Sequence, residues 1–229
     1  MTIGTKAANF LKDARSSGFP SACMKRLFYR FPSGRGHEIL RSIESARLAR
    51  DLKKAEASGA CPWNRGEFES LLRKYPKFLN YYKNRWEYLE MASVMAMKER
   101  PGSILELGAH LLPLFKRSDV MDVKRKIPRQ TYQHDLTRVP WPVKDKAYDL
   151  VMALQVWEHL EGGQEAAFRE VMRVSRSAVM SFPYLWNKPG DIHHGIDKTI
   201  IGRWTLHHPP EEIIEVGKLH SRIIYRFRF

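Results

Sequence analysis

Apolar residues follow two different patterns along the chain. They recur at helical spacing over residues 37–58 and again over residues 67–100, with a break near Tyr75 and Pro76. Beyond residue 101, short and nearly continuous apolar runs alternate with polar segments, which is typical of buried parallel strands separated by helices. The pattern predicts an α/β protein with a doubly wound, mostly parallel sheet that has helices on both faces, preceded by a helical N-terminal region.

The same patterns give the individual elements of the second half. The predicted strands are residues 104–107, 120–123, 131–135, 147–154, 178–182 and 222–229. The predicted helical segments are residues 110–117, 164–176, 197–204 and 209–217. Residues 183–195 show neither period and are expected to form a long loop. The chain is therefore divided into a helical region, residues 1–100, and an α/β domain, residues 101–229.

Positive charge is concentrated at the front of the chain. The net charge is +14, and residues 1–60 carry twelve Lys and Arg against five Asp and Glu. A positively charged surface attracts phosphates, nucleic acid or anionic lipid. The same charge is equally well explained as a solvated surface that binds no partner. No stretch approaches the ~18 apolar residues of a membrane span, and Cys23 and Cys61 have no metal-ligand spacing. We expect a cytoplasmic protein without a transmembrane segment, with peripheral attachment to the inner membrane surface as an alternative.

Chemically distinctive residues follow two central strands of the predicted sheet. Glu106 and Gly108 close the strand at residues 104–107, and Gln155 follows the strand at residues 147–154. In open α/β sheets, ligands bind beyond the carboxyl ends of parallel strands. A glycine there lets the backbone approach a bulky ligand closely. We therefore expect these three residues to border one crevice.

Four segments in this region resemble class I S-adenosylmethionine-dependent methyltransferases of the Rossmann-like, type 11-like kind. The matching segments are residues 104–108, 134–142, 148–160 and 168–174. They are similar to the family's strand-one motif acid-x-Gly-x-Gly-x-Gly, its acid-Leu…Leu-Pro-Phe loop, its Phe-Asp-x-Val…Val-Leu-Glu-His-Leu signature and its Leu-x-Glu-x-x-Arg-Val-Leu helix. Their order and spacing agree with the family, so the resemblance implies a Rossmann-like methyltransferase domain.

The resemblance implies S-adenosylmethionine as the cofactor. The implied cofactor-binding residues are Glu106, Gly108, Asp122, Asp135, Leu136 and Gln155. The Glu106 carboxylate would lie near the sulfonium and amino-acid end, Asp122 would hold the ribose hydroxyls, and Asp135 would accept from the adenine amino group. Leu136 would pack on the adenine ring, and Gln155 would line the cofactor floor.

Histidines after the fourth and fifth predicted strands are the candidate catalytic residues: His159, His193 and His194. Methyl transfer to a hydroxyl gains from a base within hydrogen-bond reach. A purely structural role, orienting the loop at a helix start, is the alternative for His159. The same region offers further metal-ligating types, namely His207, His208, Asp191 and Asp197. Because the adjacent histidine pairs lack one-face helical spacing, no metal site is predicted.

The sequence thus favours a methyltransferase that transfers the methyl group directly and in line to a small-molecule, glycan or lipid-linked acceptor. The basic residues 1–100 would form a cap on the acceptor side and favour an anionic acceptor. Positive charge also leaves open a nucleic-acid-binding protein on the same scaffold, although no RNA-recognition or helix-turn-helix signature is present. A catalytically inactive scaffold is the third alternative, because residues 109–113, directly after Gly108, contain none of the further glycines that the family usually has there. The sequence gives no signal for the oligomeric state.

Overall fold

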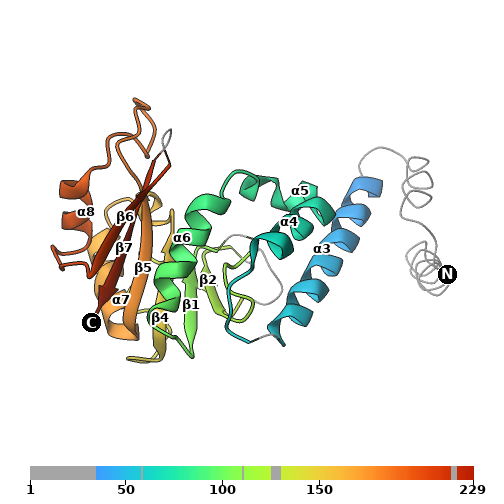
Figure 1. Cartoon of the computed structure of the whole chain (residues 1–229), viewed down its shortest axis with the longest axis horizontal. Coiled ribbons are helices and arrows are strands. Elements are labelled where there is room, and N and C mark those ends of the chain that lie inside the picture. Colours follow the sequence, from blue (N-terminus) through green and yellow to red (C-terminus); the bar gives the residue numbers. More distant parts are fainter. Residues whose placement is uncertain (1–34, 58, 110, 125–129, 218–220) are drawn as a thin grey trace. The chain divides into compact units, whose positions relative to one another are not determined.

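The chain divides into two compact units, Met1–Arg47 and Leu48–Phe229. The computed structural model describes residues 35–57, 59–109, 111–124, 130–217 and 221–229. The sheet and most helices therefore belong to the second unit (Figure 1).

A seven-stranded sheet organises the second unit, in the order β3-β2-β1-β4-β5-β7-β6 (Figure 1). The strands are β1 Ile104–Leu107, β2 Asp119–Asp122, β3 Tyr132–Gln133, β4 Tyr148–Leu154, β5 Ser175–Pro183, β6 Glu212–Val216 and β7 Arg222–Arg228. The first five strands run parallel, and β7 is antiparallel to both β5 and β6. The parallel order 3-2-1-4-5 is that of a doubly wound sheet, so the predicted fold class is confirmed.

The strand order reverses direction at β1. Leu105 of β1 lies opposite Asp119 of β2 on one side and Val151 of β4 on the other. From β1 the chain adds β2 and then β3 on one side. It then crosses back, and β4 pairs with the other edge of β1. In doubly wound sheets, this switch point between β1 and β4 opens the crevice that binds ligands.

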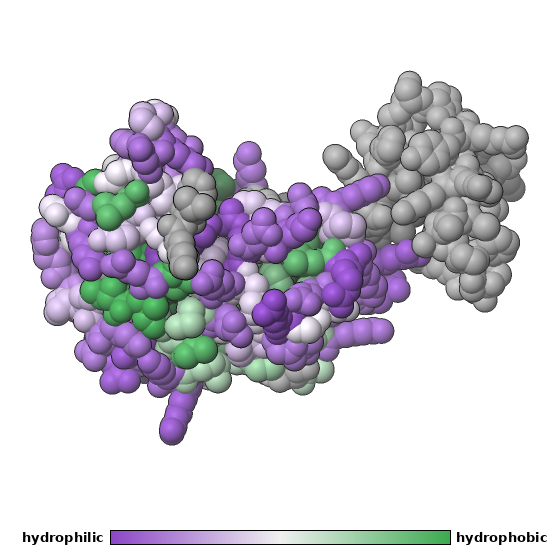
Figure 2. Space-filling view, turned by 45° about the horizontal axis from the view of Figure 1, so that its top comes forward, coloured by the Kyte–Doolittle hydropathy of each residue, from purple (hydrophilic) through white to green (hydrophobic). Residues whose placement is uncertain are grey.

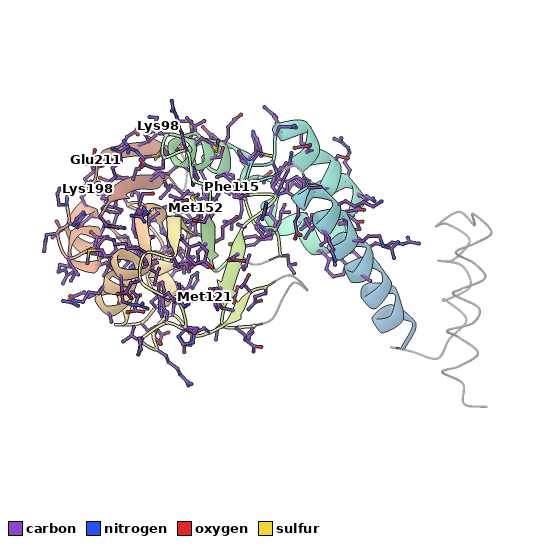
Figure 3. All side chains as sticks on the ribbon, turned by 90° about the horizontal axis from the view of Figure 1, so that it is seen from below. Lys98, Phe115, Met121, Met152, Lys198 and Glu211 are labelled. Carbon is purple, nitrogen blue, oxygen red and sulfur yellow. The ribbon has the colours of Figure 1, made fainter. Side chains whose placement is uncertain are left out.

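Helices cover both faces of the sheet. The helices of the described residues are α3 Arg35–Glu56, α4 Arg65–Lys74, α5 Pro76–Leu79, α6 Trp86–Met97, α7 Gln164–Val174 and α8 Lys198–Trp204, with short 3-10 helices η1 Asn80–Tyr82 and η2 Trp157–His159. Successive strand residues point to opposite faces. Thus Met121 belongs to the core shared with α7 and α8, whereas Met152 and Phe115 belong to the core shared with α4 and α6 (Figure 3).

The helices before the sheet begin and end at recognisable signals. Asn64 caps α4: its side-chain oxygen accepts from the Glu67 backbone N–H at 2.9 Å, and the Glu67 carboxylate accepts from the Asn64 N–H at 3.1 Å. The predicted break is confirmed, because α4 ends before Tyr75 and Pro76 starts α5. The helices α4 and α6 share a core with the sheet. That residues 1–100 form a cap on the acceptor side stays a prediction.

Two predicted helical segments are wrong. The described residues 111–117 form an irregular loop, because buried side chains outside the loop hold its backbone. Residues 209–217 contain β6 instead of a helix. The β-branched residues Ile213 and Ile214 suit a strand, and Ile214 lies opposite Ile224 of β7 in an antiparallel pair. Tertiary pairing with β7 therefore overrides the weak helical spacing of this segment.

Ion pairs join the end of α6 to the antiparallel edge of the sheet. Lys98 Nζ lies 2.6 Å from a Glu212 oxygen, and Glu99 accepts from Arg226 at 2.5 Å and from Arg228 at 3.0 Å. The Glu99 and Arg226 side chains are only 9% and 12% exposed, so this pair of the network is shielded from water. It fixes the last turn of α6 against β6 and β7.

The visible face of the described residues is largely hydrophilic, with smaller hydrophobic patches (Figure 2). Among the described helices, none combines the length and apolar character needed to cross a membrane.

Candidate functional site

A small cavity of about 60 Å³ lies at the switch point between the carboxyl ends of β1 and β4. Three predicted cofactor-binding residues line it: Glu106, Gly108 and Gln155. The lining also includes three tyrosines from the helical segment before the sheet, namely Tyr81, Tyr82 and Tyr88. The structure thus brings together the three residues that were predicted from the ends of β1 and β4. Aromatic side chains form another part of the cavity wall.

Two residues of the cavity have left-handed backbone conformations. Gly108 has φ +59°, and its N–H donates to the Met121 carbonyl at 2.8 Å. Gln155 has φ +57°, which is unusual for a residue with a side chain. Ser181 of β5 holds Gln155 in place, because its carbonyl accepts from the Gln155 N–H at 3.0 Å and its hydroxyl lies 3.3 Å from the side-chain amide. Strained conformations of this kind cluster at functional sites.

Glu106 organises the loop that follows β1. Its buried carboxylate accepts hydrogen bonds from the Leu114 N–H at 2.7 Å, the Phe115 N–H at 2.9 Å and the Ser118 hydroxyl at 2.7 Å. These donors hold the loop in an irregular path where a doubly wound sheet normally has a helix. The negative charge of Glu106 is therefore fixed in place at the cavity wall.

Tyr82 holds the first part of the same loop. Its hydroxyl donates to the Ala109 carbonyl at 2.9 Å and accepts from the Leu111 and Leu112 N–H groups at 3.2 Å and 3.1 Å. Burial raises the pKa of Tyr82 far above its ordinary value, so the hydroxyl stays protonated. Sequence reasoning missed this residue, because a tyrosine in an aromatic-rich helical segment reads as ordinary core.

Asp122 lies at the end of β2, beside β1 in the sheet. One carboxylate oxygen accepts from the Lys124 N–H at 3.1 Å. Its backbone carbonyl accepts from the Gln130 side chain at 2.8 Å and from the His134 N–H at 3.1 Å. The side chain is buried but does not line the cavity at the switch point.

Asp135 and Leu136 follow β3. The Asp135 carboxylate accepts from the Thr137 N–H at 3.0 Å and from its hydroxyl at 2.8 Å, and these bonds lower the pKa of Asp135. Leu136 is buried in the core on the α7 side. Its carbonyl accepts from the Trp141 indole at 3.0 Å, and Glu170 accepts from the Trp141 N–H at 2.6 Å. With Asp122, these residues form a second group along β2 and β3, separate from the cavity lining.

Glu158 is buried in η2, directly after β4. Its side chain is fully buried, and neither carboxylate oxygen has a hydrogen-bond partner among the described residues. Burial raises the pKa of Glu158 to about 8, although Arg222 and Arg85 favour the charged form. A buried carboxylate without partners is costly, and no local pattern in the sequence indicates it.

His193 lies against Glu158 from the loop after β5. Its Nε2 is 3.9 Å from a Glu158 oxygen, and its Nδ1 is hydrogen-bonded to Asp191. The ring stacks on Trp186 with centroids 5.2 Å apart. The His159 ring meets it edge-on at 5.5 Å. Two of the three predicted catalytic histidines are therefore adjacent in the structure.

His194 takes a different position from its neighbour His193. Its Nδ1 lies 3.0 Å from the Lys188 N–H and 3.1 Å from the Trp186 carbonyl, and the residue is exposed. The His194 ring thus connects two parts of the loop that follows β5. The catalytic role of His194 stays a prediction.

Two arginines lie against aromatic rings, two of which line the cavity and one of which stacks on His193. The Arg222 guanidinium is 4.5 Å from the Tyr88 ring centroid and 5.4 Å from that of Trp186. The Arg85 guanidinium lies 3.7 Å over Tyr81. Sequence reasoning missed this cluster, because Arg222 starts the last strand and only the sheet topology brings it here.

Comparisons with known proteins find solved structures of similar fold. No family model matches the chain, and no curated protein matches its sequence. The N-methyltransferase NodS from Bradyrhizobium japonicum WM9, solved with S-adenosyl-L-homocysteine, aligns with a TM-score of 0.46 and 15% identity, covering 79% of this chain and 97% of that one. A 1,6-didemethyltoxoflavin-N1-methyltransferase from Burkholderia thailandensis aligns with a TM-score of 0.46 and 11% identity over 74% of this chain and 94% of that one. Likeness this distant decides nothing about the reaction, so the functional conclusion depends on the residues of the site.

Proposed function

We propose that this protein is a methyltransferase that uses S-adenosylmethionine. The observation that carries the proposal is the cavity at the topological switch point, lined by Glu106, Gly108 and Gln155. Doubly wound sheets bind nucleoside-containing ligands at this place. The resemblance of the segments around these residues to class I methyltransferases points to the same cofactor.

The residues present suit the charged end of this cofactor. A sulfonium is a cation, and the carboxylate of Glu106 in the cavity wall offers the opposite charge. Gly108 and Gln155 would line the same end. When bound, the cofactor supplies a methyl group on a sulfonium, which is reactive towards a nucleophile without further activation.

The carboxylates along β2 and β3 suit the nucleoside. Asp122 would accept from the ribose hydroxyls, in the role that an acid at the end of the second strand has in dinucleotide-binding sheets. Asp135 would accept from the adenine amino group, and Leu136 would supply apolar contact. Because Asp135 has a lowered pKa, it is ionised and available as an acceptor at neutral pH.

The residues beyond β4 and β5 suit an acceptor that carries a hydroxyl and negative charge. Asp191 is ionised and can only accept, so the Nδ1 of His193 carries a proton and, in the neutral ring, the Nε2 has the lone pair. His193, and His159 beside it, could then take a proton from an acceptor hydroxyl. Arg85 and Arg222 would attract an anionic group, which supports a small-molecule, glycan or lipid-linked acceptor with phosphate or carboxylate.

The test is calorimetric binding of S-adenosylmethionine and S-adenosyl-L-homocysteine to the full chain. Asp122→Asn should weaken binding by about 10- to 100-fold, because a hydrogen bond to a charged group is lost. Asp119→Asn is the matched control, since Asp119 lies at the opposite end of β2 and should leave the affinity unchanged. Absence of binding to the wild-type chain would reject the proposal, and equal affinities for both variants and the wild type would reject the role of Asp122.

The alternatives depend on other parts of the chain. Nucleic-acid binding rests on the basic residues 1–60, most of which lie outside the described residues, so it stays a prediction. A salt series would test it, because affinity for phosphates falls steeply with salt. An inactive scaffold would show no thermal stabilisation by the cofactor. The cytoplasmic location also stays a prediction.

A further inference from the structure

We propose that Glu158, His159 and His193 form a binding site for one divalent transition-metal ion. Each residue offers one ligand atom, and the three atoms lie within 4.8 Å of one another. Glu158 and His159 come from η2 after β4, whereas His193 comes from the loop after β5. The site is therefore assembled by the sheet from two segments, which is why the sequence spacing predicted no metal.

The state of Glu158 is the first observation that points to a ligand. Its side chain is fully buried, yet neither carboxylate oxygen has a hydrogen-bond partner among the described residues. Proteins rarely leave a buried carboxylate in this state, because desolvation of the charge is not offset. A bound cation would offset it directly, since buried charges are either paired or coordinate metals.

The orientation of His193 is the second observation. Asp191 accepts from the Nδ1–H of His193, and the opposite nitrogen, Nε2, is the one that lies 3.9 Å from Glu158. Carboxylate–histidine pairs of this kind are typical around metal ions, where the carboxylate fixes the tautomer and the ring orientation. Trp186 stacks on the His193 ring and further limits its rotation. Asp191 is thus a positioning residue for His193.

The three ligand atoms lie within 4.8 Å of one another, near enough for side-chain rotations to bring them around one cation. Metal–nitrogen and metal–oxygen bonds of about 2.0–2.2 Å place neighbouring ligand atoms roughly 3–3.5 Å apart. The 3.9 Å between Glu158 and His193 is slightly longer than this. Small side-chain rotations would shorten the distance between the two ligand atoms. Glu158 and His193 are not hydrogen-bonded to each other, so no direct bond has to be broken.

The ligand types select the metal. Two imidazole nitrogens and one carboxylate suit Zn²⁺, Fe²⁺, Mn²⁺ or Co²⁺, whereas Mg²⁺ and Ca²⁺ prefer oxygen ligands alone. Three protein ligands leave at least one coordination position open. If the proposed methyltransferase function holds, an oxygen atom of the acceptor would occupy that position, so that the metal rather than a free imidazole orients the acceptor.

The experiment uses the full chain after treatment with a chelator and desalting. Titration with ZnCl₂ should give one ion per chain, and CoCl₂ should give visible absorption bands that report nitrogen ligands. Glu158→Gln and His193→Ala should each weaken Zn²⁺ binding by more than about 100-fold, because each removes a direct ligand. His207→Ala is the matched control: His207 is exposed on another segment, and its removal should leave the affinity unchanged.

Asp191→Asn separates positioning from direct ligation. This variant should lose about 10- to 100-fold in Zn²⁺ affinity while keeping the Co²⁺ absorption bands of the wild type. Circular dichroism shows whether each variant is folded, and His159→Ala replaces any variant that is not.

Two results would overturn the metal site. One is no Zn²⁺ binding to the wild-type chain beyond that of the Glu158→Gln variant, and the other is equal affinity for Mg²⁺ and Zn²⁺. A parallel titration of the chelator-treated chain with S-adenosyl-L-homocysteine keeps the two proposals apart. Cofactor binding without Zn²⁺ binding rejects the metal site alone, and Zn²⁺ binding without cofactor binding rejects the methyltransferase proposal alone.

Discussion

Gly108 and Val156 meet at the switch point of the sheet: a Cβ atom built on Gly108 would lie 2.9 Å from a methyl carbon of Val156. Gly108 follows β1 and Val156 follows β4, so the contact measures how closely the two strand ends approach. Gly108 also has φ +59°, a conformation that costs other residues energy. The close approach of the two strand ends therefore depends on the absence of a side chain at position 108.

Gly108→Ala should lower the free energy of unfolding by about 2–4 kcal/mol, because left-handed strain and steric overlap with Val156 add together. Gly162→Ala is the control, since Gly162 has φ +86° but a Cβ atom added to it would meet nothing within 4 Å. It should cost only about 1 kcal/mol, from strain alone. Urea unfolding of both variants gives the comparison, and equal costs would contradict the steric argument.

Glu106→Gln should destabilise the fold by about 2–4 kcal/mol, because the amide that replaces one carboxylate oxygen cannot accept from the loop backbone. Ser118→Ala removes only one of the donors to Glu106 and should cost about 1–2 kcal/mol. Thermal and urea unfolding measure both. A Glu106→Gln variant as stable as the wild type would show that the carboxylate does not hold the loop.

The stability of the metal-free chain should depend on pH through Glu158. Burial raises its pKa from 4.5 to about 8, so between these values the folded state binds more protons than the unfolded state. The free energy of unfolding should therefore fall as pH rises from 4.5 to 8, by up to about 1.4 kcal/mol per pH unit, and then level off. Below pH 4.5 this contribution is fully present.

Glu158→Gln should abolish the fall in the free energy of unfolding between pH 4.5 and 8. Above pH 8 the variant should be more stable than the wild type. Urea unfolding of both chains across this range, with a chelator present, makes the measurement. Parallel pH profiles for the wild type and the variant would show that Glu158 is not the buried titrating group.

Glu99→Ala should cost about 2–4 kcal/mol, because it removes the buried carboxylate that pairs with the shielded Arg226. Glu69→Ala is the control: Glu69 pairs with Arg65 and Arg73 on the surface of α4, with its side chain 44% exposed. That change should stay within about 0.5 kcal/mol. Equal losses in urea unfolding would mean that burial of the Glu99 pair adds nothing.

Local sequence patterns predicted much of the fold. Apolar runs identified β1 and β4, and the residues that end these strands, Glu106, Gly108 and Gln155, line one cavity as expected. This prediction succeeded because parallel strands bring their carboxyl ends to one edge of the sheet wherever the strands lie in the sequence. The roles of these residues in cofactor binding stay predictions until they are measured.

The sequence by itself determined the helices before the sheet, the central strands and the chemical groups that close these strands, since periodicity and strand-end position are local properties. Only the tertiary structure decided that Glu106 and Tyr82 hold a loop in place of a helix, and that residues 212–216 pair with β7. It also decided that the Glu158 carboxylate is buried beside His193. Burial and pairing depend on which distant segments meet, and no local pattern encodes that meeting.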